Sequence, residues 1–171
     1  LVVDCERTRG YVLRRMGRHG DAQAAFERAI EIRQRLGEHG DLEHLHADLA
    51  QLHITCGRAS QALASAERAI AASKRAADPR AEARALFLLE SACLRLGFSS
   101  RADEILTQIE GRPAAHVEGR ILCRRAELAL FRGRTQEARQ LIDRSDLLLP
   151  KTDPERTALH AMQWSLSGSP T

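Results

Sequence analysis

Histidine and carboxylate side chains are concentrated in one stretch of the sequence, HGDLEHLHADLAQLH, at residues 39–53. Four of the chain's seven histidines lie there, interleaved with three acidic residues. The histidines are His39, His44, His46 and His53, and the acidic residues are Asp41, Glu43 and Asp48. Because zinc and non-haem iron are bound by imidazole and carboxylate groups, this density raises the question of a metal centre.

Helical spacing argues against a metal ion shared by these histidines. His46 and His53 are separated by about 10 Å along a helix, whereas metal–ligand bonds are about 2 Å long. His44 and His46 point about 200° apart around a helix. His44 and Asp48 share a face and could supply two ligands, but the neighbouring sequence offers no third. We therefore predict no metal site and interpret the histidines as structural or surface residues, with a pH-responsive patch as the open alternative.

The sequence carries no familiar catalytic motif. It has no G-x-S-x-G elbow, no glycine-rich phosphate loop and no H-E-x-x-H pair. The cysteines are well separated and form no C-x-x-C pair, which is typical of free thiols in a reducing cytoplasm. They are Cys5, Cys56, Cys93 and Cys123. We predict no enzymatic activity, no catalytic residue and no cofactor; a cysteine acting with a distant histidine is the one catalytic pairing left open.

The charge balance is not that of a dedicated nucleic-acid or membrane binder. The 171 residues include 26 basic and 23 acidic side chains, for a formal net charge of +3. No apolar run approaches the roughly 18 residues that span a bilayer. Abundant alanine, leucine, arginine and glutamate favour helices. We expect a cytoplasmic protein, and the opening LVVDCERTRG, which lacks a methionine, suggests a fragment of a longer polypeptide.

Four blocks repeat along the chain. MGRHGDAQAAFERAI at 16–30 aligns with CGRASQALASAERAI at 56–70. LGFSSRADEILTQIE at 96–110 keeps the forty-residue spacing, and RGRTQEARQLIDRSD at 132–146 follows after thirty-six. Each block has a glycine and, five residues later, an alanine. The glycines are Gly17, Gly57, Gly97 and Gly133, and the alanines are Ala22, Ala62, Ala102 and Ala138. One helical stripe follows each glycine and another precedes it, so each repeat is predicted to be a helix hairpin.

Local signals support these hairpins. The glycine lets the chain leave the first helix, and the alanine lets the second helix pack closely against it. Asp78-Pro79 and Asp153-Pro154 each combine a helix cap with a first-turn proline. Thr135 is predicted to be a cap, and Pro113, after Gly111, is predicted to lie at a helix start.

The blocks resemble the tetratricopeptide repeat, whose second helix carries an A-x3-F pattern. Matching positions are Ala22, Phe26 and Ala29; Ala62, Ala66 and Ala69; Ala102 and Leu106; Ala138, Ile142 and Pro150. The first helices match less well: the leucine-plus-small-residue pair is kept at Leu49-Ala50 and degrades to Leu89-Glu90. The resemblance implies an all-α fold, a right-handed α-solenoid of antiparallel helix hairpins with about four repeats and a C-terminal helix.

The repeats divide the chain as follows. We place them at about residues 3–40, 41–78, 79–112 and 113–150, with 154–166 as a terminal or capping helix, in a single solenoid over residues 1–171. The forty-residue period exceeds the thirty-four of the usual repeat and is similar to that of lengthened repeats in bacterial multidomain regulators.

First helices in this family line a concave groove that binds peptides or partner helices. Helical phasing places twelve residues of this chain on that face. They are Arg7, Tyr11, Arg14, His44, Asp48, Gln51, Arg84, Phe87, Ser91, Arg120, Arg124 and Glu127. Arginines beside aromatic rings suit an extended acidic peptide. The lysine and asparagine set with which some members clamp a C-terminal carboxylate is not present, which disfavours a chaperone-tail receptor.

The resemblance also gives two of the histidines a structural role. The family pattern puts tryptophan and tyrosine where this chain has His46 and His53, so we expect these imidazoles to be buried and neutral. Acid should then loosen the second repeat first.

The functional prediction is a protein-binding or peptide-binding scaffold, the interaction segment of a larger bacterial signalling or transcription-regulatory protein. One alternative is nucleic-acid binding, because eight arginines face four acidic residues over 111–144. The other is a purely structural or self-associating module.

Overall fold

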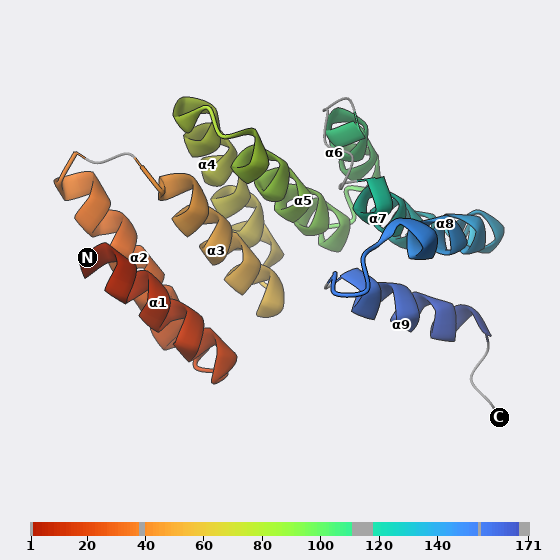
Figure 1. The fold of residues 1–171 in the computed structure, drawn as a ribbon, viewed down its shortest axis with the longest axis horizontal. Coiled ribbons are helices and arrows are strands. Elements are labelled where there is room, and N and C mark those ends of the chain that lie inside the picture. The colour runs from red at the N-terminus through yellow and green to blue at the C-terminus, as the bar shows by residue number, and fades with distance from the viewer. Residues whose placement is uncertain (1, 38–39, 111–117, 154, 168–171) are drawn as a thin grey trace. The chain divides into compact units, whose positions relative to one another are not determined.

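The computed structural model describes residues 2–37, 40–110, 118–153 and 155–167. His39, Gly111, Pro113 and Pro154, all considered above, lie outside these ranges. The described residues form nine α-helices and no strand, which confirms the all-α prediction (Figure 1). The chain divides into two compact units, Leu1–Phe98 (unit 1) and Ser99–Thr171 (unit 2). The boundary falls inside the hairpin that was expected at 79–112.

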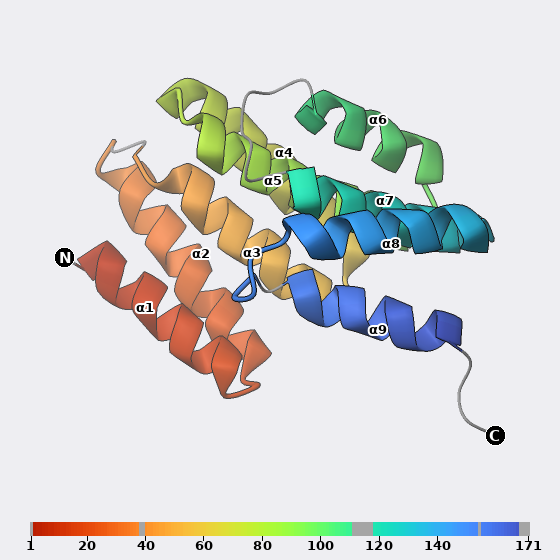
Figure 2. The same ribbon diagram turned by 45° about the vertical axis from the view of Figure 1, so that its right-hand side comes forward.

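The described residues of unit 1 form five helices, which pack as consecutive hairpins. They are α1 (Val2–Arg15), α2 (His19–Arg35), α3 (Leu42–Thr55), α4 (Ala59–Ala76) and α5 (Pro79–Arg95). Helix α1 packs along α2 and α3 along α4, while α5 packs against both α3 and α4 (Figures 1 and 2). Helix α3 is thus the central first helix of unit 1, with neighbours on both sides.

Four helices are described in unit 2. They are α6 (Ser99–Glu110), α7 (Glu118–Phe131), α8 (Thr135–Leu148) and α9 (Glu155–Ser167). Helix α7 packs against the other three, and α9 also lies along α8 (Figure 2). The core joins α7, α8 and α9 through Cys123, Ile142, Leu159 and Met162. The terminal helix predicted at 154–166 is therefore an integral part of this unit.

The repeated glycines end the first helices as predicted. Gly17, Gly57, Gly97 and Gly133 all have positive φ, between 71° and 82°. In the first turn, the N–H of Gly17 donates to the Arg14 carbonyl and the N–H of Arg18 to the Leu13 carbonyl, a Schellman pattern. These bonds satisfy carbonyls that the end of a helix would otherwise leave open.

Small residues let the paired helices approach. The four repeated alanines are fully buried, as expected. At Gly10 on α1, an added Cβ would lie 2.5 Å from Cε1 of Phe26 on α2, so only glycine fits at this crossing. Phe26 is itself fully buried, and the two residues together fix how closely α1 lies on α2.

The predicted helix starts are correct at the aspartates and wrong at Thr135. Asp78 Oδ1 accepts from the N–H groups of Arg80 and Ala81, at 2.9 and 3.0 Å. Thr135 is the first helical residue and not the cap; Arg134 takes the cap position without a side-chain bond. The reason is that the preceding glycine turn runs directly into α8.

Candidate partner-binding face

A buried carboxylate lies at the centre of the first helices of unit 1. Asp48 on α3 is 0% exposed and accepts three hydrogen bonds from neighbouring helices. Its Oδ2 accepts from Arg7 Nε at 3.0 Å and from the Tyr11 hydroxyl at 2.7 Å, both on α1. Its Oδ1 accepts from Arg84 Nη2 on α5 at 2.7 Å. One side chain therefore ties together the three first helices of the unit.

Aromatic contacts hold the α1 side of this network. The Tyr11 hydroxyl accepts from Arg7 Nη2 at 3.1 Å, and the Arg14 guanidinium lies 5.5 Å from the centre of the Tyr11 ring. The ring packs edge-on against Phe26, with 5.7 Å between centroids. Burial, and then the bond to Asp48, raise the pKa of Tyr11, so the phenol stays protonated and remains a donor.

We call this surface of α1, α3 and α5 the Asp48 face. It contains seven of the predicted residues: Arg7, Tyr11, Arg14, His44, Asp48, Gln51 and Arg84. His44 and Gln51 are half-buried.

Phe87 differs from the expectation of an aromatic ring that is exposed to a partner, because it is only 5% exposed. Helix α5 packs against two helices at once, which covers most of its surface. Ser91 is half-buried and donates to Glu90 Oε2 at 3.4 Å.

The other three predicted residues lie in unit 2, where a carboxylate of the same unit already contacts the arginines. Glu155 Oε1, at the start of α9, accepts from Arg120 at 3.3 Å and from Arg124 at 2.9 Å. Arg124 also donates to Glu127 at 2.9 Å. Helical phasing does not predict this pairing, because Glu155 lies 35 and 31 residues from the two arginines. The only signal was an acidic residue in the first turn after the Asp153 cap.

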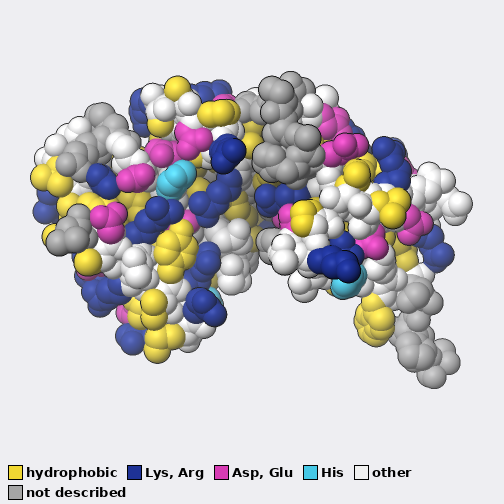
Figure 3. Space-filling view, in the orientation of Figure 1, with side chains coloured by type: hydrophobic (Ala, Val, Ile, Leu, Met, Phe, Trp, Pro, Cys, Tyr) yellow, Lys and Arg dark blue, Asp and Glu magenta, His cyan; other side chains and the backbone are white. Residues whose placement is uncertain are grey.

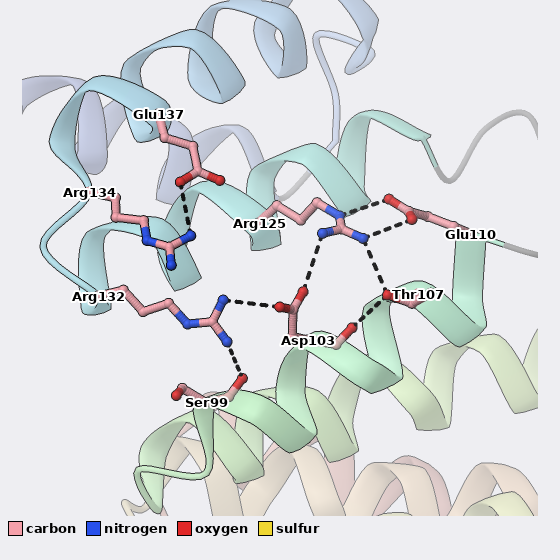
Figure 4. A network of polar contacts seen from close by, with 8 residues as sticks. All are labelled: Ser99, Asp103, Thr107, Glu110, Arg125, Arg132, Arg134 and Glu137. Atoms are coloured by element: carbon pink, nitrogen blue, oxygen red, sulfur yellow. Dashed lines mark hydrogen bonds and ion pairs between the residues drawn. The ribbon is translucent and has the colours of Figure 1, made fainter.

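A second arginine network in unit 2 was also missed. Arg125 of α7 donates to both carboxylate oxygens of Glu110 at 2.8 Å and to Asp103 Oδ1 at 3.3 Å. These contacts are drawn in Figure 4. Arg132 donates to Asp103 Oδ2 and to the Ser99 carbonyl, both at 3.0 Å. These bonds fasten α6 to α7. Glu110 and Arg125 are fifteen residues apart, so no helical period could have paired them.

The histidine stretch has a different geometry from the one first considered. Among the described residues, one group of three possible metal ligands exists: Asp41, Glu43 and His44, with ligand atoms within 4.8 Å of one another. Asp48, which shares a helix face with His44, instead binds the arginines of the Asp48 face. Arg33 Nη2 lies 2.9 Å from Asp41 Oδ2 and places a positive charge against the group, which disfavours a cation there.

His46 and His53 lie on the opposite side of α3 from Asp48. His53 is buried and His46 half-buried, as expected for positions that replace aromatic residues. Burial, followed by the charges of Arg68 and Arg75, lowers the pKa of His46 to about 4. Burial, followed by the charge of Arg58, lowers the pKa of His53. Both pKa shifts favour the neutral imidazole at pH 7, in line with the prediction.

The comparisons with known proteins agree with the fold. A family model described as tetratricopeptide repeat matches residues 6–75, which contain the first two hairpins. A comparison with curated proteins gave no match. In the described part of the chain, no helix combines the length and the apolar character needed to cross a membrane. Residues 6–75 are therefore similar to the tetratricopeptide repeat family, and this match covers less than half of the chain.

Proposed function

We propose that the Asp48 face of unit 1 binds an extended acidic segment of a partner protein. Tetratricopeptide repeats generally mediate protein–protein interaction. The observation that supports an acidic partner is the pairing of two arginines with one carboxylate. Arg7 and Arg84 share the single charge of Asp48, which leaves one positive charge in excess. Their side chains are 27% and 41% exposed, so both can meet a ligand.

Asp48 also prepares these arginines for binding. It contacts Arg7 through Nε and Arg84 through Nη2, so each guanidinium keeps further N–H groups for a second carboxylate. A guanidinium already held in place loses less conformational entropy when it binds. Arg14, stacked on Tyr11, adds a third positive charge beside them.

Unit 2 offers an internal example of the proposed contact. There Glu155 is held by Arg120 and Arg124, one turn apart on α7. A carboxylate presented from one helix can therefore bind two arginines on the surface of another in this chain. We propose an equivalent contact between a partner's acidic side chains and the Asp48 face.

Charge-neutralising variants test this proposal. A fluorescein-labelled acidic peptide is titrated against the chain, with a basic peptide of equal length for comparison. Arg84→Gln should weaken acidic-peptide binding about tenfold, because a charge-assisted hydrogen bond is worth about 1.5–3 kcal/mol. Arg35→Gln is the matched control, since Arg35 lies on α2 outside this face and is exposed. Equal binding of the two peptides, or an equal loss in both variants, would refute the proposal.

Nucleic-acid binding has less support. Of the arginines in the described part of 111–144, most pair with carboxylates: Arg120, Arg124, Arg125, Arg132 and Arg134. On the face drawn in Figure 3, basic and acidic side chains are interleaved and do not form a field of one sign. A band shift with DNA or RNA at low salt would reverse this preference.

The proposal extends to the compartment and to the protein that contains this chain. We place it in the bacterial cytoplasm, as the interaction segment of a larger regulatory protein. The support is the resemblance of its forty-residue period to the lengthened repeats of such regulators. Self-association is the competing role, and sedimentation of the chain over a range of concentrations separates the two.

A further inference from the structure

A cavity of about 600 Å³ lies on the other side of α3 from the Asp48 face. Its floor is formed by His46, Leu49 and His53 of α3, and its walls by α2 and α4. The volume is within the range of about 300–1,000 Å³ that small-molecule sites occupy. At 100° per residue, the floor residues point away from Asp48, so the cavity is separate from the proposed peptide surface.

The two walls carry opposite charges. On α2, Glu27 and Glu31 are one helical turn apart and line one side. On α4, Arg68 and Arg75 are two turns apart and line the other. Neither of these two arginines has a hydrogen bond or ion pair with a described residue. They differ in this from Arg7, Arg84 and the paired arginines of unit 2.

The two histidines of the floor have buried ring nitrogens that form no hydrogen bond with a described residue. Nδ1 of His46 and Nδ1 of His53 are buried and have no hydrogen-bond partner among the described residues. A neutral imidazole carries one N–H, and Nδ1 has no acceptor to donate to here, so we place the proton on Nε2. His53 is buried as a whole residue, which makes an unpartnered imidazole costly. With this tautomer, Nε2–H can donate to a ligand in the cavity, while Nδ1 keeps no partner among the described residues.

We propose that this cavity binds a small molecule that carries both charges. Its carboxylate or phosphate group lies against Arg68 and Arg75 and accepts from an imidazole, and its ammonium group lies against Glu27 and Glu31. An ion with one charge can pair with only one of the two walls. On the acidic wall, Glu27 also accepts from Gln23 at 2.8 Å, and Glu31 lies 3.5 Å from Arg35. The proposal is independent of peptide binding at the Asp48 face.

The experiment uses linear ω-amino acids of increasing length, from glycine to 6-aminohexanoate. This series varies the distance between the carboxylate and the ammonium group. Phosphoethanolamine tests phosphate in place of carboxylate. Hexanoate and hexylamine are the single-charge controls. Binding to the whole chain is followed by the Cε1–Hε1 NMR signals of His46 and His53 and by calorimetry.

One zwitterion of the series should shift both histidine signals and bind at least tenfold more tightly than either single-charge control. It should also raise the pKa of His46, because a bound anion offsets Arg68 and Arg75. The charges that face this imidazole across the cavity are Glu27 and Glu31 of α2.

Variants locate the site. Arg68→Gln and Glu31→Gln should each weaken zwitterion binding about tenfold, and Arg84→Gln, on the opposite face, should leave it unchanged. Circular dichroism establishes that each variant is folded. The proposal is overturned if no zwitterion or phosphoethanolamine shifts the histidine signals, if hexanoate binds as tightly as the best zwitterion, or if Arg68→Gln binds like the unaltered chain.

Discussion

Each unit contains an aspartate that holds two arginines, and the two differ in burial. Asp48 in unit 1 is 0% exposed and binds side chains from α1 and α5. Asp103 in unit 2 is 35% exposed and binds Arg125 of α7 and Arg132, which directly follows α7. The same chemical group therefore joins three helices in one unit and two in the other. Burial decides how much each contributes to stability, because water screens the exposed pair.

The largest expected effect follows from removing the buried aspartate. Asp48→Ala should lower the free energy of unfolding of unit 1 by about 3 kcal/mol, since it leaves two guanidiniums and a phenol without their shared acceptor. Urea denaturation followed by circular dichroism measures the change, and amide exchange assigns it to α1, α3 and α5. A loss below about 1 kcal/mol would mean that water replaces the carboxylate without penalty.

Acid should destabilise unit 1 more than unit 2, because unit 1 contains His46. Its folded pKa of about 4 lies below the unfolded value of 6.5, so the unfolded chain binds more protons between these values. Stability is therefore complete above about pH 6.5 and falls as the pH drops towards 4. Because the ring is partly exposed, we expect about 1–2 kcal/mol to be lost between pH 7 and pH 5.

Amide exchange at the two pH values tests this sign and its location. Exchange should rise in α3 and α4 before it rises in α8, and His46→Gln should remove most of the difference. The described histidine of unit 2, His160, is exposed and has no comparable position in a core. A uniform loss in both units, or no loss, would contradict the prediction.

The smallest effect is expected at the exposed aspartate. Asp103→Ala should cost less than about 1 kcal/mol, because half-exposed ion pairs contribute little and Arg125 keeps its two bonds to Glu110. The same denaturation experiment, carried out in low and in high salt, measures it. If Asp103→Ala costs as much as Asp48→Ala, burial is not what distinguishes the two networks.

Sequence reasoning recovers the local features of this fold. A glycine followed by an alanine five residues later places each turn and each close helix pair, because both requirements act within one hairpin. Helical phasing also puts Arg7, Asp48 and Arg84 on a common face. It does not reveal that they bond to one another, since the partners of Asp48 are 41 and 36 residues away.

The remaining features depend on contacts between helices. Phasing alone gives Phe87 an outward direction, but the packing of α5 against two neighbours buries it. The bonds from Arg120 and Arg124 to Glu155 depend on where α9 folds back, which no period of the sequence encodes. The boundary between units after Phe98 likewise interrupts a repeat whose sequence is continuous.

The four turn positions need glycine for its backbone conformation and not because neighbouring atoms leave too little space. A Cβ added at Gly17, Gly57, Gly97 or Gly133 would meet nothing within 4 Å, so steric exclusion by neighbouring groups plays no part in their selection. What each position demands is a left-handed backbone, which ordinary side chains adopt only at a cost of about 1–2 kcal/mol. Asparagine, which tolerates this conformation better than alanine, is thus the substitution that these turns accept most readily.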